Sequence, residues 1–111
     1  MKCFIRLADV APIDEGGHLS YEMLTENNGC VAGCSAGISV FSETEYPLPA
    51  VHDDQEGFLV LEGSGSARVG EAEFLIEPEV SFIVPAGTPH CIKKDPASIQ
   101  LKVFWFHSAV K

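Results

Sequence analysis

Alternation of apolar and polar residues recurs in short segments from residue 38 onward, and glycine, proline or small polar residues bound most of them. A period of two is the pattern of a β-strand that buries one face. The segments with this pattern are 38–42, 57–62, 67–69, 73–76, 80–84 and 99–107. Short strands separated by frequent turn signals predict an all-β sandwich or barrel.

The residues between these segments predict how some strands are joined. Gly70 lies in the short connection between 67–69 and 73–76, which predicts a hairpin. Pro85 and Gly87 stand at the second and fourth positions of a tight turn, an arrangement that suits a type I turn. The chain is therefore expected to reverse sharply just before His90.

The first 35 residues are less regular. Residues 4–7 predict an edge strand or a strand exchanged with a second copy, and residues 20–24 predict another strand. Residues 29–37 are mostly small and predict a flexible loop. No segment combines a helical period with helix caps.

Composition and charge limit the class of protein. The 111 residues are 46% apolar and 21% charged, which fits one globular domain. Sixteen acidic residues outnumber seven basic ones, and the net charge is −9. Binding to nucleic acid or to an anionic membrane needs clustered lysine and arginine, which this chain lacks. We therefore expect no nucleic-acid partner and no membrane partner.

The chain is also expected to be cytoplasmic. No apolar run reaches the roughly 18 residues that span a bilayer, and Arg6 and Asp9 interrupt the apolar start. The cysteines are then expected to be free thiols. The three residues between Cys30 and Cys34 differ from the two-residue spacing of redox or zinc-knuckle pairs. These two thiols could act at a site only if their loop folded over it.

Two histidines stand at strand ends beside candidate turns. His52 precedes the strand 57–62 within an acidic segment, and His90 follows the strand 80–84 after two prolines. Two imidazoles and one carboxylate on one face bind divalent transition metals and leave coordination positions open. The alternative is that both histidines are ordinary turn residues.

The residues around these histidines resemble the two motifs of the cupin family. Glu56 follows His52 by four positions, and Gly63 follows Glu56 by seven, as in the first motif. Residues 85–90 read Pro-Ala-Gly-Thr-Pro-His, which fits the central part of the second motif. The resemblance implies a double-stranded β-helix, or jelly-roll barrel, over about residues 36–107 of a single domain 1–111. Residues 1–35 are then expected to pack on this barrel or to exchange with a partner.

The resemblance also implies a ligand set for one divalent ion, namely His52, Glu56 and His90. Iron, zinc, nickel and manganese are all compatible with these donors. Ala50 stands where the first histidine of the first motif is expected. Asp54 or Gln55 could supply a fourth donor. In the second motif, Glu79 replaces the opening glycine and Lys94 replaces the final asparagine.

The last strand alternates between two faces. Ile99, Leu101, Val103, Trp105 and His107 share one face, which is expected to line the barrel. His107 is a candidate general base or a hydrogen-bonded structural histidine, and Trp105 is a stacking platform or a core aromatic. Phe104 and Phe106 lie on the outer face and predict a homodimer interface, in agreement with the small cupins, which are commonly dimers.

Three interpretations of function remain open. The first is a metal-dependent enzyme that acts on a small polar substrate, either carbohydrate-like or organic-acid-like. The second is a non-catalytic module that binds or senses a small molecule without metal. The third is a metal-free structural dimer. The fold alone does not choose among them.

Overall fold

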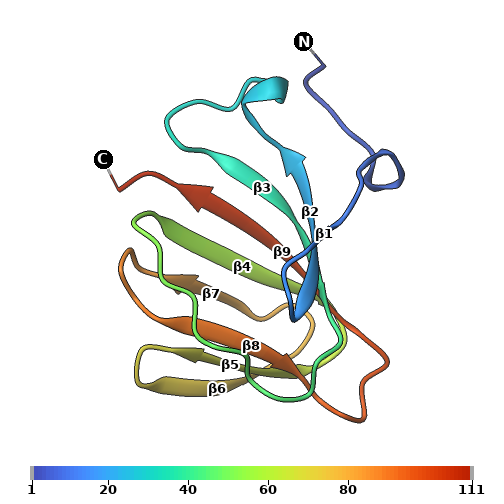
Figure 1. Ribbon diagram of the computed structural model, residues 1–111, viewed down its shortest axis with the longest axis vertical. Coiled ribbons are helices and arrows are strands. Elements are labelled where there is room, and N and C mark those ends of the chain that lie inside the picture. The colour runs from blue at the N-terminus through green and yellow to red at the C-terminus, as the bar shows by residue number, and fades with distance from the viewer. Residues whose placement is uncertain (1, 111) are drawn as a thin grey trace.

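Nine short strands, counted over residues 2–110, form two antiparallel sheets that face each other (Figure 1). The structure is a computed structural model, and it describes those residues. The strands are β1 (Ile13–Asp14), β2 (His18–Leu24), β3 (Ser35–Phe41), β4 (Gln55–Glu62), β5 (Gly65–Val69), β6 (Ala72–Ile76), β7 (Ser81–Val84), β8 (His90–Lys94) and β9 (Leu101–Ser108).

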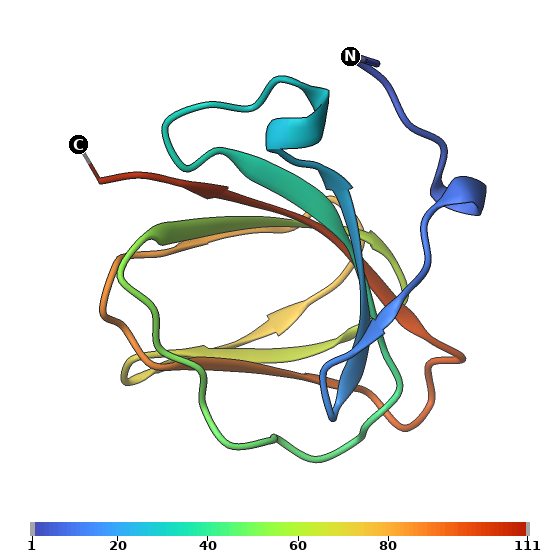
Figure 2. The same cartoon turned by 45° about the horizontal axis from the view of Figure 1, so that its top comes forward.

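The two sheets differ in size. The larger has the order β1-β2-β3-β9-β4-β7, and the smaller has the order β6-β5-β8. Figure 2 shows the larger sheet curving over the smaller one. The helical content of the described residues is limited to two 3₁₀ turns, Leu7–Asp9 and Glu26–Asn28, and no helix among them is long and apolar enough to cross a bilayer. The predicted all-β jelly-roll barrel is therefore confirmed.

Most of the expected strands are present, including the hairpin of β5 and β6 around Gly70. Residues 4–6 lie in no strand, however, because β1 supplies the strand that pairs with the free edge of β2. Strand β8 was not expected, because a lysine at position 94 breaks the apolar pattern. Lys94 is nevertheless buried in the structure. The Lys94 ammonium group donates to the backbone carbonyls of Asp95 and Ser98, which makes its burial possible.

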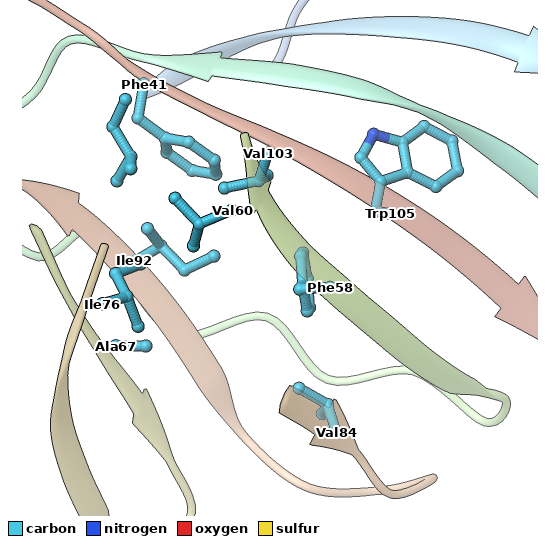
Figure 3. Close-up of a cluster of buried hydrophobic side chains, with 10 residues drawn as sticks. Phe41, Phe58, Val60, Ala67, Ile76, Val84, Ile92, Val103 and Trp105 are labelled. Carbon is cyan, nitrogen blue, oxygen red and sulfur yellow. The ribbon is translucent and has the colours of Figure 1, made fainter. Parts of the chain in front are cut away.

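One hydrophobic core lies between the sheets (Figure 3). The alternation predicted for the last strand is present in β9, where Leu101, Val103 and Trp105 are buried. Ile99 precedes β9 and is fully exposed. The core consists of Phe41, Phe58, Val60, Ala67, Ile76, Val84, Ile92, Leu101, Val103 and Trp105. Burial of branched and aromatic side chains from both sheets stabilises the barrel without disulfides.

Glu79 has a backbone conformation that favours glycine. Its φ is 76°, and it is the third residue of a turn in which the Val80 N–H donates to the Glu77 carbonyl at 3.0 Å. Replacing Glu79 with glycine is expected to raise the free energy of unfolding by up to about 1 kcal/mol. Thermal denaturation should show a melting temperature a few degrees higher. Glu71→Gly, at an exposed position without positive φ, should lower it instead.

The outer face of the larger sheet carries exposed apolar side chains on three adjacent strands. Leu59 and Leu61 lie on β4, Ile83 on β7 and Phe106 on β9, with exposed fractions between 37% and 50%. The Phe106 ring covers Gly57, its register partner, where a Cβ atom would otherwise stand. These four residues are named the outer apolar face. Such contiguous exposed surface is typical of an interface.

We propose that the outer apolar face pairs with that of a second copy. Light scattering is expected to give twice the chain mass of 12.0 kDa. Leu59→Glu should shift the protein toward the monomer, because burying a carboxylate in this interface is unfavourable. Leu75→Glu, on the exposed surface of the other sheet, should leave the mass unchanged. A wild-type mass of one chain at all concentrations would contradict this proposal.

Candidate metal centre

Three histidines and one glutamate meet at one end of the barrel. Glu56 and His107 are direct register partners in the antiparallel pair of β4 and β9. His90 begins β8, where its backbone N–H and C=O pair with those of Ala50 at 3.0 and 2.9 Å. His52 lies in the loop that leads into β4. The two predicted motifs are therefore brought together by strand pairing.

The turn before His90 also holds His52 in position. The Gly87 N–H donates to the His52 carbonyl at 2.8 Å, and the Thr88 N–H donates to the Pro85 carbonyl at 3.2 Å. Gly87 has a φ of 75°. The turn therefore runs from Pro85 to Thr88 with a positive φ at its third residue, and the predicted type I turn ending at Gly87 was wrong. Glycine supplies this conformation at little cost.

Each of the three imidazoles directs Nε2 toward the carboxylate of Glu56. The distance is 3.1 Å from His52 and 3.4 Å from His90, both to Oε1. His107 approaches Oε2 at 3.2 Å. Glu56 and His90 are buried, while the His52 and His107 side chains are 28% and 23% exposed. The cluster is thus buried on one side and reachable from the barrel mouth on the other.

The opposite nitrogen of each ring faces an oxygen. His90 Nδ1 lies 3.0 Å from the Thr88 carbonyl. The Asp54 carboxylate contacts the other two rings, with Oδ1 2.6 Å from His52 Nδ1 and Oδ2 3.0 Å from His107 Nδ1. Burial alone would raise the pKa of Asp54, but hydrogen bonds and charge interactions with His107 and His52 outweigh it and lower the pKa. Asp54 therefore remains ionised and positions both rings.

These contacts decide where the ring protons are. A backbone carbonyl only accepts hydrogen bonds, so His90 Nδ1 carries the proton and the neutral ring has a bare Nε2. That lone pair faces a carboxylate oxygen, which is repulsive unless a proton or a cation lies between them. Burial alone would lower the pKa of His90, but its hydrogen bonds to Glu56 and Thr88 and the Glu56 charge raise it. The cluster therefore attracts positive charge.

Two overlapping groups in this cluster have the geometry to hold a metal ion. One is His52, Glu56 and His90, and the other is His52, Asp54 and His107. The first contains the three residues that the sequence predicted as ligands. Histidine ligands in metal sites commonly donate their second ring N–H to a carboxylate or a carbonyl, as these do. The donor set fits a divalent transition metal.

His107 was predicted as a candidate base, and the structure brings its Nε2 into the same cluster. Sequence reasoning did not connect it with Glu56, because their contact depends on the register of two strands about 50 residues apart. Asp54, considered as a fourth donor, contacts the outer nitrogens of His52 and His107. Gln55 instead donates to the Ala109 carbonyl at 3.1 Å.

A cavity of about 350 Å³ opens beside the cluster. Its wall includes Trp105, whose ring centroid is 5.3 Å from that of His107, and His18, which stacks on Phe41 at 4.5 Å. Trp105 is both a buried core aromatic and part of this wall, so the two predicted roles coexist. The lining is completed by Glu15, Gly17, Ser20, Glu22, Ser39, Pro47, Leu48, Ala50, His52, Glu56, Phe58, His90, Cys91 and Ile92.

The cysteines take no part in either candidate group. All four are free thiols. Cys30 and Cys34 are in contact, and partial burial together with that contact raises the pKa of Cys30, but neither lines the cavity. Cys91 is buried, and burial raises its pKa.

Comparison with known proteins agrees with this geometry. The family model of the cupin domain matches residues 38–107. The chain belongs to the cupin family. No curated protein matches this cupin.

Solved structures resemble this cupin in fold at low sequence identity. The polyketide cyclase RemF from Streptomyces resistomycificus has a TM-score of 0.78 and 15% identity, over 93% of this chain and 76% of its own. Hydroxypropylphosphonic acid epoxidase from S. wedmorenis has a TM-score of 0.79 and 12% identity, over 94% of this chain and 58% of its own. The Cnp3 cupin domain of Schizosaccharomyces pombe has a TM-score of 0.75 and 16% identity, over 94% of this chain and 67% of its own. The chain thus spans little more than half of the epoxidase.

Proposed function

We propose that this cupin is a metal-dependent enzyme that binds one divalent transition metal ion and acts on a small polar molecule. The observation that carries the proposal is the convergence of three Nε2 atoms on the Glu56 carboxylate at 3.1 to 3.4 Å. His52, Glu56 and His90 are the predicted ligands, and His107 Nε2 lies 3.2 Å from the second Glu56 oxygen. Three protein ligands leave coordination positions open for substrate.

The chain's own residues define what such a site would do. A bound divalent ion would supply Lewis-acid or redox chemistry to a ligand oxygen. Asp54 and the Thr88 carbonyl hold the rings in one tautomer, so the Nε2 lone pairs are available. The buried aromatics Phe58 and Trp105 form an apolar part of the cavity wall beside the cluster.

The similarity to enzymes is consistent with this proposal. RemF is described as a polyketide cyclase, and the epoxidase has been crystallised as an Fe(II) form. At 12 to 15% identity these structures support the fold, and the activity proposed for this chain rests on its own residues.

The proposal is tested first by metal content. Protein purified without added metal, then supplied with iron, zinc, nickel or manganese, should hold close to one ion per chain by elemental analysis. Trp105 is the single tryptophan and lies beside His107. Copper or cobalt bound at the cluster should therefore quench the intrinsic tryptophan fluorescence, and zinc added beforehand should prevent the quenching. Failure of all these metals to bind would favour the metal-free binding module.

A further inference from the structure

Two serine side chains, register partners on β2 and β3, line the same cavity as the metal centre. Ser20 and Ser39 are 7% and 4% exposed, and both line the cavity. On β9, the Trp105 N–H is buried and has no hydrogen-bond acceptor within residues 2–110. Buried polar groups normally have partners. The cavity wall therefore offers serine hydroxyl groups to a ligand that carries oxygen atoms.

Among residues 2–110, no lysine and no arginine line the cavity. Its carboxylates are Glu56 at the metal centre and Glu15 and Glu22, which are exposed at the rim. Together with Asp54 behind the histidines, four carboxylates lie at or beside the cavity. They outnumber the two positive charges of one divalent ion, so an anionic ligand would enter against the local charge.

Three basic groups outside the cavity are already engaged. Lys94 donates to two backbone carbonyls. Arg68 and Lys93 lie over the Tyr46 ring at 4.2 and 4.6 Å. His18 does line the cavity, but burial lowers its pKa despite the neighbouring carboxylates, so the ring is neutral at neutral pH. None of these groups supplies a cation for a phosphate or phosphonate.

We propose that the cavity takes a small uncharged or amine-bearing molecule with hydroxyl groups, and that it discriminates against phosphate, phosphonate and polycarboxylate ligands. This proposal deepens the proposed function and rests on it. Hydroxyl oxygens would face Ser20, Ser39 and the metal centre, while an ammonium group would be favoured near Glu15 and Glu22. The volume of about 350 Å³ fits a small metabolite. The phosphonate named for the similar epoxidase is accordingly expected to be a poor ligand here.

Three probes with the same three-carbon hydroxyl skeleton test this charge preference. They are isopropanolamine, which is cationic, propylene glycol, which is neutral, and hydroxypropylphosphonate, which is anionic. Each is titrated into zinc-loaded and metal-free protein, with the indole N–H resonance of Trp105 as the readout and zinc content measured in the same samples. We expect the phosphonate to bind at least about tenfold more weakly than the amine, a difference of about 1.4 kcal/mol.

A pair of variants separates the rim charges from the overall charge of the protein. Glu15→Gln combined with Glu22→Gln should reduce the difference in binding affinity between the amine and the phosphonate, while the zinc content stays unchanged. Glu71→Gln combined with Glu77→Gln removes the same charge from exposed positions on either side of β6 in the other sheet. This pair should leave the difference in affinity between amine and phosphonate intact.

The outcomes distinguish this inference from the proposed function. Phosphonate binding as tight as amine binding in the zinc-loaded protein, or no response to any probe, would overturn the inference even if zinc is bound. An absence of bound zinc would instead overturn the proposed function. The relative affinities of the three probes for the metal-free protein would then still decide the charge preference.

Discussion

Replacing His90 with alanine is expected to abolish stoichiometric metal binding. His90 is the most buried of the three histidines, and its Nδ1 is committed to the Thr88 carbonyl, which leaves Nε2 for the ion. Loss of a group that orients a ligand already lowers metal affinity about 10- to 100-fold. Loss of a ligand itself should therefore lower metal affinity at least about 100-fold. Elemental analysis after dialysis, and titration with zinc, measure this effect.

His18→Ala is the matched control for that experiment. His18 lines the same cavity, but its ring stacks on Phe41 and it belongs to neither candidate group. It should retain close to one ion per chain. Far-UV circular dichroism should show the same β-sheet signal for both variants, because neither side chain belongs to the hydrophobic core. Full metal content in a folded His90→Ala protein would remove His90 from the ligand set.

Asp54→Asn is expected to lower metal affinity about 10- to 100-fold without unfolding the barrel. Asp54 Oδ2 accepts from His107 Nδ1 at 3.0 Å and Oδ1 forms an ion pair with His52 Nδ1 at 2.6 Å, whereas an asparagine has one acceptor oxygen and no charge. At least one ring would lose its orientation and its preferred tautomer. Competition with a zinc indicator gives the affinity, and the visible spectrum of the cobalt form reports the changed ligand geometry.

The neighbouring carboxylate provides the control for the second experiment. Asp53 is exposed and makes no hydrogen bond or ion pair among the described side chains. Asp53→Asn removes the same charge one position away, so it should leave affinity and the cobalt spectrum close to wild type. Equal losses in both variants would mean that Asp54 acts through general charge rather than through the rings.

The strands were predictable from the sequence because the signal for a strand is local. Period-two alternation identified β4, β6 and β9, and Gly70 identified the hairpin that joins β5 to β6. His52 and Glu56 lie four positions apart, so their proximity also depends on a short stretch of chain. The failures have local causes as well. The buried Lys94 breaks the apolar pattern of β8, so this strand was not predicted. Strand β1 pairs with the edge of β2 where residues 4–7 were expected to form a strand.

Glu79 shows how a departure from a motif can be tolerated. In the sequence, Glu79 stands where the second motif opens with glycine, and the structure gives it a φ of 76°. The cost of that conformation is of the order of 1 kcal/mol. The surrounding hydrogen bonds, from the Val80 N–H to the Glu77 carbonyl and from the Glu79 N–H to the Val60 carbonyl, hold the turn in place.

By itself, the sequence determined the all-β class, most strands and three of the residues in the cluster, because alternation, turns and motif spacing depend on neighbours along the chain. Only the tertiary structure decided that His107 joins them and that Asp54 orients two rings. His107 and Asp54 are 53 positions apart, and their contact exists because β4 and β9 pair in one particular register. A shift of that register by one residue would turn His107 to the outer face, so the completed cluster is a property of strand pairing rather than of any single segment.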